Sequence, residues 1–303
     1  MIITKSSYKD IFAVELKTAE LTVLVLPHNG GKIASIKNNK SGREYLVQNP
    51  NPKYSPLDIN GSFEKTECSG FDDMFPTIDG ITFTDAYGRE LTYPDHGEVC
   101  RVKHEYKIDG DRLTLYYKSN ALNYSHTKTF FEKDGKLSIE YAVENFADCD
   151  FNALWAGHLL INAEQGGRVL LPFKDGSPVD VTFDFTGRFK AGDRIEYKEE
   201  YLKSVWEKGV PACKKLYFPL PAPQGYIAYE YPNGDIFVME FDKNQLPYIG
   251  IWENLGHLNG QYCLGLEPCS VGYDTVINGE KKGQSRPIKA GETMRFYINL
   301  LVK

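Results

Sequence analysis

Apolar and polar residues alternate along several stretches of the chain. Between positions 136 and 144 every second residue is apolar, namely Leu137, Ile139, Tyr141 and Val143. The C-terminal stretch repeats this pattern with Met294, Phe296, Ile298, Leu300 and Val302. A period of two places successive side chains on opposite faces of an extended chain. Both stretches are therefore predicted to be strands with one buried face.

Turn-forming dipeptides separate further stretches of this kind. Asp-Gly stands at 109–110 and 134–135, and Asn-Gly stands at 233–234. These residues tolerate the positive φ that tight hairpin turns require. They predict a turn before a strand at 112–118, and hairpins that join 124–132 to 136–144 and 226–231 to 236–241.

The remaining pattern predicts more strands and few helices. Strands are expected at residues 11–16, 21–26, 32–37, 98–106, 152–161, 214–218, 248–253 and 262–267. Helical signals are confined to 64–68 and 195–207. More than a dozen strands without alternating helices favour a large antiparallel β-sandwich over a fold built from βαβ units. Because no linker-like segment interrupts the pattern, residues 1–303 are expected to form one domain.

Composition and charge narrow the classes of partner. The content of 20 Tyr, 17 Phe, 27 Gly and 16 Pro is typical of strands joined by tight turns. Lys and Arg number 35 and Asp and Glu 41, a net charge of −6, and no basic run is present. This argues against a nucleic-acid or membrane-surface partner. No apolar stretch reaches the length of a membrane helix, and the N-terminus lacks a secretory signal pattern, so a cytoplasmic location is expected.

The six cysteines and six histidines show no standard metal spacing. Cys-x-x-Cys, His-x-His and His-Glu-x-x-His are all absent, as are the glycine-rich motifs of nucleotide binding. The cysteines are therefore interpreted as reduced thiols, and neither a metal nor a cofactor is expected.

Three polar residues interrupt stretches that otherwise look buried or tightly turned. His158 lies in the apolar run 153–161, and Glu267 shares a strand face with Cys263 and Gly265. His96 lies between Pro and Gly residues at the entrance of a predicted strand. Taken singly, each is also compatible with a structural role.

Trp252 adds an aromatic ring to this set. Alternation places it on the same strand face as Gly250, whereas Ile249 and Ile251 point to the other face. Aromatic rings stack on the C–H faces of sugars, so Trp252 is predicted to face a sugar.

The order of these residues resembles the galactose mutarotase (aldose 1-epimerase) family. The resemblance rests on His96-Gly97 followed by Arg101, then His158, then Glu267, with support from the segments 30–36 and 70–77. It implies the large antiparallel sandwich called the supersandwich and interconversion of the α and β anomers of an aldose without a cofactor. By this resemblance, Glu267 acts as base, His158 as acid, and His96 assists at the ring oxygen or a neighbouring hydroxyl.

One part of the family pattern is missing. The simple galactose mutarotases have a sugar-anchoring Asp between the acid His and the base Glu, whereas the corresponding stretch 214–218 holds none. Asp72 and Asp73 could replace it. Alternatively, a cation such as Lys32 or Arg101 could bind a phosphate, and Arg101 is the one tied to a motif. The expected partner is thus a hexose or a hexose phosphate.

The pair Glu267 and His158 suits the chemistry of anomer exchange. An ionised carboxylate can remove the anomeric proton, and an imidazole with an ordinary pKa near 6.5 can be protonated near neutrality. Two alternatives remain open. The protein could bind carbohydrate without catalysis on the same fold, or His96, His158 and Glu267 could hold a metal as a two-His-one-carboxylate set.

Overall fold

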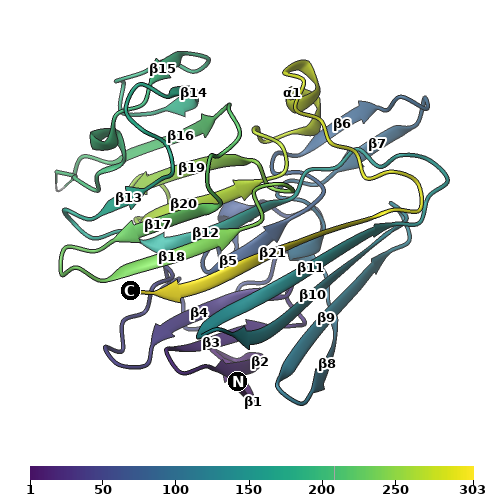
Figure 1. The fold of residues 1–303 in the computed structure, drawn as a ribbon, viewed down its shortest axis with the longest axis horizontal. Coiled ribbons are helices and arrows are strands. Elements are labelled where there is room, and N and C mark those ends of the chain that lie inside the picture. Colours follow the sequence, from purple (N-terminus) through teal and green to yellow (C-terminus); the bar gives the residue numbers. More distant parts are fainter. Residues whose placement is uncertain (208) are drawn as a thin grey trace.

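Two stacked antiparallel sheets form the framework of the fold in the computed structural model, which describes residues 1–207 and 209–303 (Figure 1). In spatial order the 11-stranded sheet contains β1 (Ile2–Tyr8), β2 (Ile11–Lys17), β3 (Leu21–Leu26), β4 (Lys32–Asn38), β5 (Phe71–Met74), β12 (Ala156–Asn162), β20 (Tyr262–Cys269), β19 (Tyr248–Leu255), β16 (Ala212–Phe218), β14 (Pro178–Asp184) and β15 (Arg194–Glu196).

The second sheet has eight strands and covers one face of the first (Figure 1). Its spatial order is β13 (Arg168–Leu170), β17 (Tyr226–Glu230), β18 (Ile236–Phe241), β21 (Thr293–Val302), β11 (Lys136–Asn145), β10 (Tyr124–Lys133), β9 (Arg112–Ser119) and β8 (Glu105–Asp109). A separate hairpin consists of β6 (Ile81–Thr84) and β7 (Glu90–Tyr93). The helical elements are α1 (Val276–Lys281) and three 3₁₀ turns, Phe63–Lys65, Val99–Arg101 and Glu199–Leu202.

The predicted all-β sandwich is confirmed, and the periodic strands are found with small shifts at their ends. In the hairpin between β10 and β11, Asp134 and Gly135 have φ of 52° and 75°, and Lys133 pairs with Lys136. This is the two-residue turn that the sequence predicts. Before β9 the turn is displaced by one residue, because Asp109 pairs with Arg112 and Gly110 takes the positive φ.

Three predicted elements differ from the structure. The predicted strand at 98–106 is a 3₁₀ turn followed by β8, because the amides of Glu98 and Val99 both donate to the carbonyl of Phe75. The predicted strand at 152–161 begins only at Ala156. The predicted helix at 195–207 is instead the end of β15, which pairs with β14, and a 3₁₀ turn. The helix α1 was not predicted.

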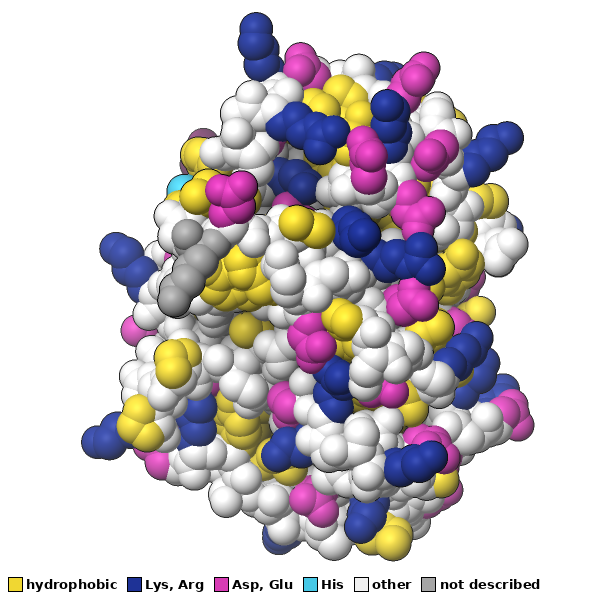
Figure 2. Space-filling view, turned by 90° about the vertical axis from the view of Figure 1, so that its left-hand side faces the viewer, with side chains coloured by type: hydrophobic (Ala, Val, Ile, Leu, Met, Phe, Trp, Pro, Cys, Tyr) yellow, Lys and Arg dark blue, Asp and Glu magenta, His cyan; other side chains and the backbone are white. Residues whose placement is uncertain are grey.

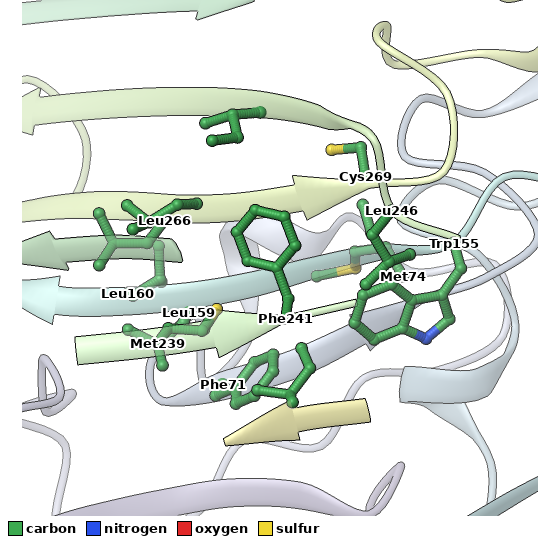
Figure 3. Close-up of a cluster of buried hydrophobic side chains, with 14 of the residues drawn as sticks. Phe71, Met74, Trp155, Leu159, Leu160, Met239, Phe241, Leu246, Leu266 and Cys269 are labelled. Atoms are coloured by element: carbon green, nitrogen blue, oxygen red, sulfur yellow. The ribbon is translucent and has the colours of Figure 1, made fainter. Parts of the chain in front are cut away.

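The main core fills the space between the two sheets. Figure 3 shows aromatic and aliphatic side chains from both sheets in contact, among them Phe71 of β5, Leu266 of β20 and Phe241 of β18. Because Leu266 points into this core, Glu267 next to it points to the outer face of the 11-stranded sheet. The core thus fixes which side chains are available on that outer face.

One buried ion pair crosses the core. The ammonium of Lys128 on β10 lies 3.0 Å from Asp73 Oδ2 on β5, and both side chains are 0% exposed. Tyr141 on β11 donates a hydrogen bond of 3.0 Å to Asp73 Oδ1. Removing one partner of such a pair typically costs about 3–5 kcal/mol because the remaining charge stays buried. This contact links the two sheets through specific side chains.

The charged surface agrees with the composition. On the face shown in Figure 2, Lys and Arg side chains are interspersed with Asp and Glu. Among the described residues, no helix is long and apolar enough to cross a membrane.

Two fully buried histidines predict loss of stability in acid. Burial lowers the pKa of both His104 and His126 to about 3. The unfolded chain takes up a proton near pH 6.5, and the folded chain does not until about pH 3, so stability falls as the pH drops from 6.5 toward 3. We expect wild type to lose about 2 kcal/mol more than His126→Leu between pH 7 and pH 5, measured by urea unfolding.

His257 provides the control for this experiment because its side chain is exposed. His257→Leu should follow the wild-type pH dependence. Equal pH slopes for wild type and His126→Leu would contradict the prediction.

Candidate functional site

A cavity of about 490 Å³ opens on the outer face of the 11-stranded sheet. Its wall includes three imidazoles, three carboxylates, an ammonium and an indole, contributed by His96, His158, His257, Glu64, Asp79, Asp274, Lys215 and Trp252. These residues come from separate parts of the chain. A small cleft with a few convergent polar groups and an aromatic wall is the usual form of a small-molecule site.

Strand register places the strand-borne residues on one face. Lys215 on β16 pairs with Trp252 on β19, and Trp252 pairs with Gly265 on β20. Glu267 lies two residues beyond Gly265, opposite Gly250. Since alternate residues share a face, these side chains form one surface, in agreement with the predicted alternation within each strand.

Two glycines provide the space that the Glu267 carboxylate occupies. A Cβ added at Gly265 would lie 2.8 Å from Glu267 Oε1, and one added at Gly250 would lie 3.1 Å from Oε2 and 2.7 Å from the Tyr217 ring. The approaches of 2.8 and 2.7 Å are shorter than real Cβ contacts, and the approach of 3.1 Å would require the carboxylate to shift. The space that the two glycines leave beside Glu267 is therefore occupied by the carboxylate of Glu267 itself.

The Glu267 carboxylate is 0% exposed and has two different oxygens. Oε2 accepts a short hydrogen bond from the Lys215 ammonium. Oε1 has no hydrogen-bond partner among the described residues and lies 4.0 Å from His158 Nε2. One oxygen is thus held, and the other is free beside an imidazole.

Asp274 extends this network toward the opening of the cavity. Its Oδ1 lies 3.5 Å from the Lys215 ammonium and accepts a hydrogen bond of 2.6 Å from Tyr217. Lys215 is buried and bridges two carboxylates. Its charge is therefore compensated within the protein.

Burial shifts the titration of the central groups in opposite directions. It raises the pKa of Glu267, and the charge of Lys215 opposes that shift. Burial also opposes protonation of Lys215, but Glu267 and Asp274 outweigh it and raise the pKa of the ammonium. For His158, burial and then the positive charges of His96, Lys215 and Lys32 lower the pKa well below 6.5. The expectation that His158 carries a proton near neutrality is therefore not supported by its surroundings.

His96 approaches from a loop at the cavity wall. Its φ is 58°, and its ring stacks on Phe63 with centroids 4.1 Å apart. The His96 and His158 rings lie 5.5 Å apart at nearly a right angle. Nδ1 of His96 lies 2.8 Å from Asp95 Oδ1. Burial opposes ionisation of Asp95, but the hydrogen bond and charge of His96 hold its pKa below the usual value.

Arg101 does not line the cavity. Its guanidinium is 0% exposed and donates to the backbone carbonyls of Asp95, Gly97, Asp58 and Gly61. Two of these carbonyls, those of Asp95 and Gly97, flank His96, and the other two belong to the segment 58–61, so the Arg101 donors are used within the protein. The structure therefore places Arg101 behind the site, not in contact with a ligand.

The other predicted ligands also lie behind the cavity wall. Lys32 forms a buried ion pair with Asp72. In the strand register of β5 and β12, Asp72 lies opposite His158. Asp73 points between the sheets to Lys128. None of Lys32, Asp72 and Asp73 lines the cavity.

Sequence reasoning missed Lys215, Asp79 and Asp274. Lys215 lies in the stretch that lacks the expected Asp, and strand parity from Phe218 could have shown that Lys214 and Lys215 point to opposite faces. Asp79 and Asp274 lie outside strands and carry no periodic signal. The structure brings them together because the amides of Ile78 and Asp79 both donate to the carbonyl of Asp274.

His96, His158 and Glu267, the set considered as an alternative metal site, do not form a ligand cluster. No group of three His, Cys, Asp or Glu side chains within residues 1–207 and 209–303 is placed to hold a metal ion. The Lys215 ammonium on Glu267 also puts a positive charge where the alternative needs a divalent cation. These residues therefore do not support a metal site.

The fold and the cavity define a two-sheet antiparallel β-sandwich with a candidate small-molecule site on the outer face of one sheet. The architecture is the galactose mutarotase-like fold, as the sequence resemblance implies. The chain is similar to Slr1438 from Synechocystis sp. PCC 6803, with TM-score 0.72, 17% identity and 98% of both chains covered.

Two further solved structures have the same architecture. A galactose mutarotase-like protein from Clostridium acetobutylicum matches with TM-score 0.72 and 14% identity, over 100% of this chain and 98% of that chain. A proposed aldose 1-epimerase from Escherichia coli K12 matches with TM-score 0.68 and 16% identity, over 100% and 99%. At these identities the likeness shows the fold. No protein-family model matches the chain, and no curated protein matches it.

Trp252 is expected to report ligand binding. It is 9% exposed, lines the cavity, and its ring lies 6.1 Å from the His158 ring. A sugar in the cavity should change its fluorescence, and Trp252→Phe should remove most of that change in a titration with free aldoses. Trp206→Phe is the control because Trp206 packs on Tyr262 and is not among the residues that line the cavity. A response that survives Trp252→Phe would contradict this placement.

Proposed function

We propose that this protein is an aldose 1-epimerase-like isomerase that interconverts the α and β anomers of a hexose. The observation that carries the proposal is that His96 and His158 line one cavity beside Trp252, with Glu267 Oε1 4.0 Å from His158 Nε2 behind the cavity wall. The similarity of the fold to galactose mutarotase-like proteins supports a sugar ligand. A carboxylate and two imidazoles are also the groups that ring opening and closure require.

In the proposed reaction, Glu267 removes the proton from the anomeric hydroxyl. The free Oε1 accepts that proton, while Oε2 stays bound to Lys215. As the C1–O5 bond breaks, the ring oxygen takes up a proton, and rotation about C1–C2 lets the ring close on the other face. Positioned acid and base groups typically contribute about 10² to 10⁴-fold each.

We assign proton donation to the ring oxygen to His96, with His158 in an orienting role. Nδ1 of His96 lies 2.8 Å from the Asp95 carboxylate, which leaves Nε2 as the nitrogen that would donate to the ring oxygen, whereas burial disfavours a charged His158. This reverses the order of roles that the resemblance implies. His158 faces Oε1 and so can orient the sugar hydroxyl toward the base.

The charges around the cavity favour an unphosphorylated sugar. Three acidic residues, Glu64, Asp79 and Asp274, line the cavity, and Glu267 lies behind its wall. A phosphate of charge near −2 would meet these acidic groups, and Lys215, the one lysine or arginine among the described lining residues, is already paired with two carboxylates. Carboxylates instead accept hydrogen bonds from sugar hydroxyls, so Asp79 and Asp274 are proposed as the groups that replace the missing strand Asp.

The base assignment predicts a large loss of rate in Glu267→Gln. The amide keeps the shape but cannot accept the proton, so turnover should fall about 10² to 10⁴-fold while sugar binding remains. Anomer exchange by NMR measures the rate, and Trp252 fluorescence measures binding. Because burial raises the pKa of Glu267 above 4.5, the wild-type rate should fall on the acid side at a pH above that value. Exchange at the wild-type rate in Glu267→Gln would refute the assignment.

The charge argument predicts a preference between substrates. We expect kcat/KM for a free hexose to exceed that for its 6-phosphate by at least about tenfold, which corresponds to about 1.4 kcal/mol. Asp79→Asn should narrow this gap by removing one negative charge. Arg101→Ala should affect both sugars to the same extent because Arg101 binds backbone carbonyls. Faster exchange with the phosphate would contradict the prediction.

A non-catalytic carbohydrate-binding protein is the second candidate, and one observation favours it. Glu267 is fully enclosed and ion-paired, so a sugar hydroxyl reaches Oε1 only if the side chains that cover it move. An anomer-exchange screen across aldoses decides between the two. Saturable binding without exchange above buffer for any sugar would establish this candidate and reject the isomerase.

A further inference from the structure

We propose that Lys215 is a positioning residue of the proposed reaction, which holds the Glu267 carboxylate ionised and leaves Oε1 as its one reactive oxygen. This inference rests on the proposed function for its catalytic meaning. The geometry of the ion pair, however, can be tested without any activity.

The contacts of Lys215 are specific for this role. Its ammonium donates to Glu267 Oε2 and lies 3.5 Å from Asp274 Oδ1, while the Tyr217 hydroxyl binds the same Asp274 oxygen at 2.6 Å. Lys215, Tyr217 and Glu267 lie on one face of three adjacent strands. The strand register therefore directs the ammonium at one side of the carboxylate.

The surroundings of Glu267 show why a cation is needed there. Asp274 follows β20 and disfavours a second negative charge, whereas Lys215 on β16 and His96 on its loop favour it. His158 on β12 faces Oε1, and Cys269 lies on the same strand as Glu267. An isolated buried carboxylate would take up a proton. Lys215 is the residue in contact with Glu267 that carries a compensating charge.

Fixing Oε2 also determines the orientation of the Glu267 carboxylate. With Oε2 held, Gly250 and Gly265 confine the carboxylate and His158 lies on the side of Oε1. A neutral side chain at position 215 would release this constraint. Lys215 thus acts through Glu267, and its loss should shift the titration of Glu267 as well as the rate.

The neighbouring lysine provides a matched control. Lys214 lies on the same strand but on the opposite face, where it forms an ion pair of 2.6 Å with the buried Glu253. Lys214→Met therefore removes a comparable buried pair without touching Glu267. Lys215→Arg keeps the charge and should retain most of the effect.

The experiment titrates Glu267 directly by ¹³C NMR of protein with labelled glutamate carboxyls, with the Glu267 signal identified by its absence in Glu267→Gln. We expect Lys215→Met to raise the midpoint of the Glu267 titration by at least about one pH unit, with Lys215→Arg and Lys214→Met close to wild type. The acid side of the anomer-exchange profile should move by the same amount. An unchanged midpoint in folded Lys215→Met would overturn the proposal.

A second variant covers the case in which Lys215→Met does not fold. If Lys215→Met/Glu267→Gln folds like Glu267→Gln, the defect arises from an uncompensated Glu267 carboxylate, as proposed. If the double variant is as unstable as Lys215→Met, Lys215 is structural in its own right and the proposal fails. A wild type without exchange on any aldose would refute the isomerase alone, because the carboxyl titration still decides the role of Lys215.

Discussion

The ion pair between Lys128 and Asp73 is the contact on which the arrangement of the candidate site depends. It lies in the dry space between two sheets, where an unpaired charge is not tolerated. Asp73 must therefore point toward the second sheet, where both Lys128 and Tyr141 reach it. Since adjacent strand residues alternate between faces, Asp72 must point to the outer face. There it lies opposite His158, so one buried pair fixes the neighbourhood of a candidate site residue.

The same requirement for paired charges organises the outer face. Asp72 is paired with Lys32 on one side of His158, and Glu267 is paired with Lys215 on the other. Each lysine makes its carboxylate acceptable in a buried position. Together they add positive charge around the imidazole, which contributes to the lowered pKa of His158. Burial is the main cause of the lowered pKa of His158, and the lysines of the two pairs add to it after His96.

The sequence predicts those features that depend on periodicity. The strands at 21–26 and 236–241 are found with the predicted bounds, and the register of β19 and β20 agrees with the predicted alternation within each strand, which groups Glu267 with Gly265 and Trp252 with Gly250. Residues whose partners come from distant segments could not be assigned in this way. Arg101 was predicted as a phosphate ligand, but its guanidinium donates hydrogen bonds to four backbone carbonyls of neighbouring loops. No local pattern indicates such a set of acceptors.

Loops supply the carboxylates that a strand provides in the simple mutarotase pattern. Asp274 follows β20, and its carbonyl accepts the amides of Ile78 and Asp79, which ties the loop after β20 to the loop before β6. Its side chain is then held by Tyr217 and Lys215 on the sheet. Position 215 can therefore hold a lysine without leaving the cavity devoid of carboxylates. The proposed base Glu267 and the proposed orienting residue His158 are fixed by strand register, whereas the proposed acid His96 and the proposed sugar-anchoring groups are held by loops, so the two sets can change independently.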